Sequence, residues 1–573
     1  MNNQNVLTSW IVSSEERVFE NDLPKEGITK LKALINEPVS FSLAYRSFLP
    51  IPPNGRVADV PFSVSVNSDT LPASVYKVSF VPFSAAFCED GKGKTGACPD
   101  LLLPRISSSE LIHLGDRSVP YYEKGERVLL NASSRETQSV FVTLNEKGEA
   151  LAAGEHSVCV RIVSLMSGEE LARHEIKVHL IDALLPENEL LYTNWVHYDC
   201  IAEDHGLAVW SDEYFDVLGK YLKNASLHGM TTVLLPAFTP PLDTAVGLER
   251  MNVQLLGVRE AGEGYEFDLS LIRRFIRVAK ENGIRYFEHC HLFSQWGAEN
   301  AITVYGERNG ENVKIFDCNT PASSPKYRTF LRSYLAAFLA LAKEEGVERD
   351  LLFHLSDEPF VPNLESYRAA RDAVMDILDS HRVGDALSDY VFYEKGLCPL
   401  PIVDMERAAE FDGRCDNLML YYTGGEPTAG MSNRLLTDAP PRTRILGLHL
   451  FRYHAKGFLH WAYNFTYGRM SQGHFDPAKE PCFYKNIPGV TYLVYPNREN
   501  ILYSSLREKG MRSAMNDYRA LKLLESFIGF DATLALCEAS LGEKVDFLTI
   551  PKSAEAMLAL REAINEAIES HIK

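Results

Sequence analysis

The sequence lacks the features that place a protein in a membrane or on nucleic acid. No stretch approaches the ~18 consecutive apolar residues that a membrane-spanning helix requires. No run rich in Lys and Arg offsets the net charge of −19, which results from 58 basic and 77 acidic side chains. This charge balance repels phosphate backbones and anionic lipid surfaces, so we expect neither nucleic acid binding nor membrane insertion.

Secretion signals and cysteine motifs are also missing. Residues 1–20 contain neither a basic segment nor an apolar core, which predicts a cytoplasmic protein without a signal peptide. The 10 cysteines show no C-x-x-C spacing of the kind that holds zinc or performs thiol exchange. Cys88 and Cys98 flank a short loop, but free thiols are the expectation in a cytoplasmic chain, and their pairing stays open.

The 573 residues exceed what one hydrophobic core supports, and the pattern changes along the chain. Residues 1–185 alternate apolar and polar side chains over short segments separated by Pro, Gly, Asn and Asp, which predicts an N-terminal β-sandwich. Residues 531–573 form a polar amphipathic pattern, which predicts a C-terminal helical extension packed on the domain before it.

In residues 186–530, apolar strand-like runs alternate with helical patterns. The predicted strands cover 190–197, 231–238, 284–292, 351–356, 386–394, 401–405, 417–423 and 457–465. Eight strand–helix units predict a catalytic (β/α)8 TIM barrel, so the chain is a multidomain β plus α/β protein. A doubly wound sheet is the alternative, but no glycine-rich dinucleotide loop follows any of these strands.

Active-site groups of a barrel gather at the carboxyl ends of its strands. The side chains predicted there are Trp195, His197, Asp199, Phe238, Asp243, His289, His291, Trp296, Asp357, Glu358, Tyr393, Glu394, Tyr421, Tyr422, Trp461, Tyr463 and Asn464. This set is rich in aromatic and carboxylate groups and contains neither Lys nor Arg. A sugar site has this composition, whereas a phosphate site needs basic groups or a glycine-rich loop.

The stretch "LLFHLSDEPF" ends the fourth predicted strand with Asp357 and Glu358. The same sequence would also fit Ser356 as the N-cap of the next helix, followed by acids that complement the dipole of that helix. Position at a strand end favours catalysis. Adjacent carboxylates need not face each other across a sugar ring, and they suit a substrate whose own 2-acetamido group is the nucleophile.

His289 and His291 have the H-x-H spacing of a metal pair, which keeps a metal-dependent barrel hydrolase as an alternative hypothesis. A non-catalytic, sugar-binding barrel is a second alternative. Neither residue spacing nor composition decides between these hypotheses and a glycosidase.

Five segments in this order resemble glycoside hydrolase family 123, also grouped as domain of unknown function 4091. They are "NWVHYDCIA", "FHLSDEP", "LYYTGGEP", "GFLHWAYN" and "SLREKGMRSAMNDYRAL". The resemblance implies a β-sandwich joined to a (β/α)8 barrel, and a retaining exo-β-N-acetylgalactosaminidase that uses a substrate-assisted (oxazoline) mechanism without a cofactor. By this resemblance Glu358 is the general acid/base, and Asp357 orients the acetamido group.

The resemblance also implies the substrate contacts and the partner, a glycan or glycoconjugate with a terminal β-linked N-acetylhexosamine. Tyr393 or Tyr422 would bond the acetamido oxygen, and Trp461 would stack on the sugar. The remaining contacts are expected from Trp195, His197, Asp199, His291, Tyr463 and Asn464. The galacto or gluco preference, the natural glycan and the oligomeric state stay open.

Overall fold

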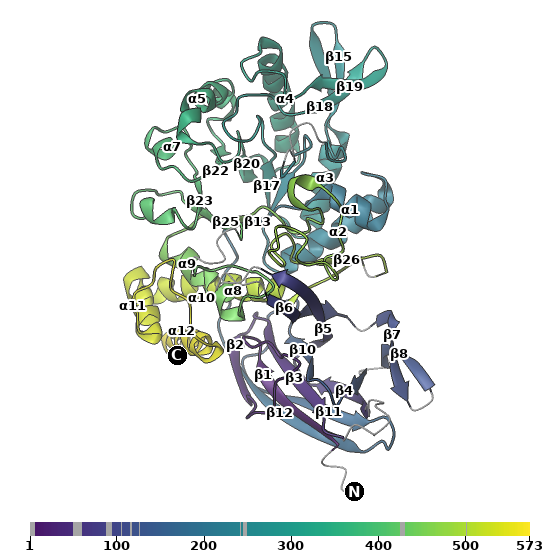
Figure 1. Ribbon diagram of the computed structural model, residues 1–573. Helices are drawn as coiled ribbons and strands as arrows, with labels where there is room; N and C mark the ends of the chain where they lie inside the picture. Colours follow the sequence, from purple (N-terminus) through teal and green to yellow (C-terminus); the bar gives the residue numbers. More distant parts are fainter. Residues whose placement is uncertain are drawn as a thin grey trace.

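The computed structural model describes residues 6–49, 60–86, 94–104, 106–114, 117–124, 127–240, 242–244, 249–424, 430–499 and 501–572. A β-rich N-terminal region lies below an α/β domain, and the C-terminal helices lie beside the junction of the two (Figure 1). Cys98 is a buried free thiol, whereas Cys88 lies outside the described residues. Among the described helices, none has the length and apolarity needed to cross a membrane.

The N-terminal region consists of two sheets. One contains β1 (Leu7–Ser13), β3 (Val39–Ser47), β10 (Gln138–Leu144), β5 (Ala73–Ala86) and β6 (Lys94–Leu103), in this spatial order. The other contains β2 (Lys30–Leu34), β12 (Glu170–Ile181), β11 (Gly154–Ser164), β4 (Val60–Asn67), β9 (Arg127–Ala132), β8 (Arg117–Lys124) and β7 (Ile106–Leu114). Alternate residues of β11, such as Val158 and Val160, share a core with Phe41 and Leu43 of β3, which confirms the predicted β-rich region.

The α/β domain contains two parallel sheets. The first has the order β13 (Leu191–Asn194), β25 (Gly457–His460), β24 (Met419–Tyr421), β23 (Ile402–Asp404) and β22 (Ala386–Leu387). The second has the order β14 (Thr232–Leu235), β17 (Tyr286–His289), β20 (Leu351–Phe353) and β21 (Arg382–Val383). Every predicted strand position therefore contains a strand, although shorter than predicted. Strand pairing among the described residues leaves the two sheets separate and does not show a closed barrel.

One predicted strand is largely wrong. Within 386–394 only Ala386–Leu387 is extended, and Val391–Glu394 forms helix α7. Gly396 has a φ of 66°, and Leu397 donates its N–H to the carbonyl of Phe392 over 2.9 Å, so left-handed capping ends the helix there. This local chemistry outweighs the β propensity of the aromatic residues. Tyr393 consequently lies on a helix and not at a strand end.

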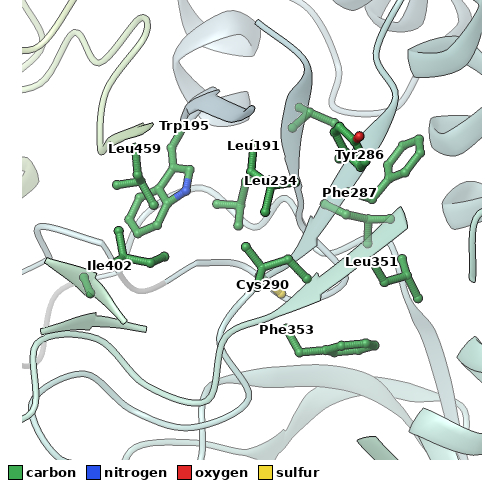
Figure 2. Packing of buried hydrophobic residues seen from close by; sticks show 14 of the residues in the cluster. Leu191, Trp195, Leu234, Tyr286, Phe287, Cys290, Leu351, Phe353, Ile402 and Leu459 are labelled. Atoms are coloured by element: carbon green, nitrogen blue, oxygen red, sulfur yellow. The ribbon is translucent and has the colours of Figure 1, made fainter. Parts of the chain in front are cut away.

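Side chains of both sheets fill one buried hydrophobic cluster. Leu191 and Leu459 of the first sheet and Leu234 and Leu351 of the second belong to it (Figure 2). Helices cover the sheets: α1 (Tyr198–His205), α2 (Asp212–Leu227), α3 (Ser270–Glu281), α4 (Pro325–Glu344), α5 (Leu364–Asp372), α6 (Met375–Leu378), α8 (Pro440–Arg444) and α9 (Leu446–Arg452). The predicted end of α3 is confirmed, because Gly283 adopts a φ of 90° directly after it.

Two small sheets, which the sequence did not predict, extend the loops of the α/β domain. One contains β16 (Gly264–Asp268), β15 (Gly257–Ala261), β18 (Val304–Arg308) and β19 (Glu311–Phe316). It projects at the end of the molecule opposite the N-terminal region (Figure 1). The other pairs β26 (Tyr495–Asn497) with β27 (Ile501–Tyr503).

The C-terminal helices α10 (Leu506–Ile528), α11 (Phe530–Leu541) and α12 (Ala554–Ile572) join the two parts of the chain. Their apolar residues share a core with Leu34 and Ile181 of the N-terminal sheets and with residues of α9. The buried guanidinium of Arg561 on α12 lies 2.7 Å from Asp517 of α10 and 2.7 Å from Glu37 after β2. The C-terminal extension therefore packs on both the α/β domain and the β-rich region.

Candidate active site

A pocket of about 320 Å³ opens where the parallel strands of the α/β domain end. Most residues around it come from loops after six of these strands, and Ala386, Tyr421 and Leu459 belong to the strands themselves. The residues around the pocket are Trp195, Leu242, Asp243, Gln295, Trp296, Asp357, Glu358, Ala386, Tyr421, Thr423, Leu459, Trp461, Arg469, Met470, Tyr484 and Lys485. The pocket thus combines aromatic side chains with carboxylates at the edge of the sheets where the sequence predicted the site.

Asp357 and Glu358 lie together in this pocket. Asp357 is only 9% exposed, and its Oδ2 accepts a hydrogen bond from Nε2 of Gln295 over 3.0 Å. Oε1 of Glu358 accepts the hydroxyl proton of Tyr421 over 2.8 Å. The next α-helix, α5, begins six residues after Glu358 and has Asn363 as its N-cap, so neither acid caps it. The helix-capping interpretation of this segment is therefore wrong.

The backbone at the acid pair is held in an uncommon conformation. Glu358 has a φ of 42°, in the left-handed region that residues with a side chain seldom adopt. Its N–H donates to the carbonyl of Ala386 over 2.9 Å, and the N–H of Trp296 donates to the carbonyl of Asp357 over 2.7 Å. Strained residues of this kind persist where the surrounding structure holds them, and they concentrate at functional sites.

The surroundings of Asp357 perturb its ionisation. Burial, followed by the negative charge of Glu358, raises the pKa of Asp357 well above its usual range. Two neighbouring carboxylates disfavour simultaneous ionisation, so the pair retains one proton near neutral pH. A carboxyl pair that holds one proton is suited to general acid–base chemistry.

Aromatic side chains line the outer part of the pocket. Trp461 packs against Tyr484 with ring centroids 5.5 Å apart, and Trp296 is 49% exposed. Asp243 holds this side together, because its carboxylate accepts the Tyr484 hydroxyl over 3.2 Å and the Met470 N–H over 3.0 Å. Asp243, Trp296 and Met470 all have a positive φ, in the left-handed region that residues with a side chain seldom adopt.

Several predicted substrate contacts are instead buried behind the pocket. The guanidinium of Arg250 donates to Asp199 over 2.6 Å and to Nδ1 of His197 over 3.0 Å. Burial and the charge of Arg250 lower the pKa of His197 to about 3, so this imidazole is neutral. Asn464 accepts the backbone N–H of His197 over 2.9 Å, and Tyr463 donates to Glu508 over 2.8 Å. These four predicted residues support the pocket and do not line it.

Of the predicted contacts other than the acid pair, the structure places Trp195 and Trp461 in the pocket, but neither predicted tyrosine. The Tyr422 hydroxyl is buried and contacts Sδ of Met511 at 3.6 Å. The ring of Tyr393 packs on Tyr390, with centroids 5.8 Å apart. The tyrosine that reaches the acid pair is Tyr421, one residue before Tyr422 and on the opposite side of the strand end.

The two histidines of the H-x-H segment point to different surroundings. His289 bonds the hydroxyl of Tyr334 over 2.7 Å and the carbonyl of Cys290 over 2.6 Å, so both its ring nitrogens have partners. The buried His291 stacks on His354, with centroids 5.1 Å apart, and does not line the pocket. Within the described ranges no three His, Cys, Asp or Glu side chains come together as a metal site. The geometry does not support the metal-dependent alternative.

Sequence reasoning missed Gln295, Arg469, Tyr484 and Lys485. Gln295 follows β17 in an irregular loop, and the other three belong to the long connection between β25 and β26. This connection has no periodic apolar pattern, so the sequence contains no signal that it folds back over the strand ends.

Comparison with solved structures supports the fold. A solved family 123 glycoside hydrolase from Clostridium perfringens, described for glycolipid glycan hydrolysis, matches 99% of this chain and 97% of its own, with a TM-score of 0.70 and 14% identity. A Bacteroides uniformis β-glucuronidase matches 75% of this chain and 44% of its own, but its TM-score of 0.27 at 8% identity carries no argument. No curated protein matches the sequence.

A family model gives the decisive match. The model described as "Glycoside hydrolase 123, catalytic domain" covers residues 195–524, which are more than half of the 573 residues. This range contains every residue of the pocket. The chain therefore belongs to glycoside hydrolase family 123 and contains the catalytic domain of a glycosidase.

Proposed function

We propose that this glycosidase removes terminal β-linked N-acetylgalactosamine from a glycan or glycoconjugate, with retention of configuration and with the acetamido group of the substrate as nucleophile. The observation that carries the proposal is the adjacent pair of Asp357 and Glu358 in one aromatic pocket. Two neighbouring acids of this kind divide the work between proton transfer and orientation of the acetamido group.

The other carboxylate of the pocket supports substrate assistance. A retaining mechanism with an enzyme nucleophile requires a second carboxylate across the scissile bond, about 5–5.5 Å from the acid. Among the residues described around the pocket, Asp243 is the third acid, and its carboxylate already accepts bonds from Tyr484 and Met470. The acetamido oxygen of the substrate is therefore the nucleophile in this proposal.

The first step follows from the positions of the two acids. Protonated Glu358 donates its proton to the glycosidic oxygen while the acetamido oxygen attacks C1, so the aglycone leaves and an oxazolinium ring forms. Asp357, as the carboxylate, accepts the acetamido N–H. In the unliganded pocket the raised pKa of Asp357 favours its protonated form. Because a hydrogen bond to a carboxylate favours its ionised form, substrate binding moves this proton to Glu358.

The second step reverses the roles. The Glu358 carboxylate takes a proton from water, and the resulting hydroxide attacks C1 from the side that the aglycone left, which opens the ring with net retention. In this proposal the Tyr421 hydroxyl turns from Glu358 to the acetamido oxygen when substrate binds, and it takes the role expected of Tyr393 or Tyr422. Trp461 stacks on the sugar, next to Trp296 and Tyr484.

We also propose that the two parallel sheets are the walls of one (β/α)8 barrel, with domain boundaries near residues 185 and 530. One hydrogen bond and one short connection support this. Thr231, before β14, donates its N–H to the carbonyl of Tyr192 in β13 over 3.0 Å. On the other side, only Gly384 and Asp385 separate β21 from β22.

The test is a panel of aryl β-glycosides of N-acetylgalactosamine, N-acetylglucosamine, galactose and glucose. We expect hydrolysis of the two acetamido sugars only, fastest for the galacto isomer, and inhibition by the corresponding thiazoline analogue. Glu358→Gln should lose most turnover and recover part of it on an aryl glycoside with a good leaving group, which needs little protonation. Hydrolysis of β-galactoside at an equal rate, or no inhibition by the thiazoline, would refute the mechanism.

A further inference from the structure

A buried charged cluster lies beneath the acid pair. The ring of His354, three residues before Asp357, lies between two carboxylates: Nε2 is 3.6 Å from Glu288 and Nδ1 is 3.5 Å from Asp385. His354 is 1% exposed, and both acids are fully buried. No residue of this cluster has a role in the mechanism above, although buried charges are costly and rarely occur without a purpose or a partner.

The surroundings favour a protonated ring. The two ring nitrogens lie 3.5 Å and 3.6 Å from carboxylate oxygens, which is longer than an ordinary hydrogen bond, but two buried carboxylates on either side of the ring attract the positive charge of an imidazolium. The titration agrees with this arrangement. Burial by itself would lower the pKa of His354, but Asp385 and Glu288 outweigh it and raise the pKa to about 10. His354 is therefore a buried cation between two anions at neutral pH.

One of these anions holds the backbone of the acid pair. Asp385 Oδ1 accepts the N–H groups of Leu355 and Ser356, over 2.8 Å and 3.2 Å, directly before Asp357. Its Oδ2 accepts the hydroxyl of Tyr367 over 2.6 Å. The residue after Asp385 supplies the carbonyl that binds the N–H of Glu358. The position of Asp385 therefore determines the path of the chain through the site.

The other anion holds the inner side of the pocket. Oε2 of Glu288 accepts the indole N–H of Trp195 over 3.0 Å and the hydroxyl of Thr193 over 2.9 Å. The Trp195 ring contacts the edge of His354, with centroids 5.9 Å apart. His354 thus connects, through its two carboxylates, the loop that carries the acids and the tryptophan that lines the pocket.

The charged and titratable groups that face His354 are Glu288, Asp385, Asp357, His291 and His289. Burial, together with the charge of His354, lowers the pKa of His289 to about 4, so His289 is neutral. Burial and the charge of His354 lower the pKa of His291 well below its usual range, so it contributes no charge. The cation favours the ionised form of Asp357, whereas Glu358 and Asp385 oppose it. His354 therefore lowers the pKa of Asp357, whereas Glu358 and Asp385 raise it.

We propose that His354, held between Glu288 and Asp385, is a positioning residue that favours the ionised form of the Asp357 carboxylate when substrate binds and keeps this carboxylate aimed at the acetamido group of the substrate. This inference rests on the role given to Asp357 in the proposed function. It assigns His354 no contact with the substrate and no proton transfer to it.

The test compares two variants whose charges change in opposite senses. His354→Gln removes the cation, so the acidic limb of the kcat/KM profile should move up by about one pH unit or more, with the largest loss of activity at neutral pH. Glu288→Gln removes one anion and keeps hydrogen-bonding atoms for Trp195 and Thr193, so the limb should move down. His289→Gln is the matched control, because His289 is equally buried but bonds Tyr334. Its acidic limb should stay in place.

Opposite shifts of the acidic limb in the two variants support the proposal. A merely structural role of His354 would lower activity without separating the acidic limbs of the two variants. Unmoved limbs, or shifts of both variants in the same direction, overturn it. If His354→Gln does not fold, Glu288→Gln alone decides: a downward shift supports the proposal, and an unmoved or raised limb overturns it. Failure of the proposed function would appear in the wild type, as a missing acetamido preference or thiazoline inhibition, whereas failure of this inference appears only in the variants.

Discussion

Tyr421→Phe removes one hydroxyl group from the acid pair and so tests the placement of Tyr421 in the site. The hydroxyl of Tyr421 donates to Oε1 of Glu358 over 2.8 Å, and its ring is buried, so phenylalanine keeps the packing and removes only this donor. A hydrogen bond to a charged group contributes about 1.5–3 kcal/mol, and each 1.4 kcal/mol is about tenfold in rate. We therefore expect kcat/KM on an aryl β-N-acetylgalactosaminide to fall by about 10- to 150-fold.

Tyr422→Phe is the control for this experiment. Its hydroxyl is equally buried but contacts only the sulfur of Met511 at 3.6 Å, which is a weak acceptor. The variant should keep kcat/KM within about threefold of the wild type, which corresponds to less than about 0.7 kcal/mol. Thermal unfolding of both variants identifies any general loss of structure. Equal losses in the two variants, or full activity of Tyr421→Phe, would refute the placement of Tyr421 at the acid pair.

Three further changes test the pocket and the fold. Because the folded protein raises the pKa of Asp357, the stability contributed by its protonated form is complete below the pKa of an unfolded Asp and is lost as pH rises through the raised value. Asp357→Asn should therefore abolish turnover yet raise Tm, with a gain that widens from about pH 5 to about pH 9 in scanning fluorimetry; a gain that shrinks as pH rises would contradict this sign. Trp461→Ala should raise KM by about tenfold, the equivalent of about 1.4 kcal/mol, with little change in kcat, and an unchanged KM would remove Trp461 from the sugar contact. Asp517→Asn removes one of the two buried carboxylates that bind each of Arg444 and Arg561, which keep Glu15 and Glu37 respectively, so urea unfolding should show a loss of about 3 kcal/mol, and a loss below about 1 kcal/mol would contradict the importance of these ion pairs.

The strand positions of the α/β domain were predictable because each is a short apolar run between turn residues. "LLFHLS" and "TTVLLPAF" show this pattern, and β20 and β14 lie within them. How the strands divide into two sheets was not predictable, since pairing depends on a few hydrogen bonds between neighbours. The aromatic run at 391–394 misled the prediction because a glycine cap, and not side-chain propensity, determines its structure.

The acid pair was predictable from its place at a strand end, but its surroundings were not. Near the end of β24 a shift of one residue reverses which side chain faces the pocket, so Tyr421 and Tyr422 were indistinguishable in the sequence. His197 and Asp199 were expected at the substrate because nothing near them in the chain indicates that Arg250, about 50 residues later, binds both. The sequence did not show which side chains line the pocket where a residue distant in the chain binds the side chain, as Arg250 binds His197 and Asp199.

The contact of Arg561 with Glu37 has a consequence for how the protein is made. These residues are 524 positions apart in the sequence, and α12 completes a hydrophobic core to which β2 and β12 also contribute. During synthesis the ribosome therefore releases Leu34 and Ile181 long before their last partners exist. Until α12 emerges, the nascent chain exposes this apolar surface and the unpaired charge of Glu37. We expect the newly made β-rich region to remain a chaperone substrate until α12 has emerged and packed against it.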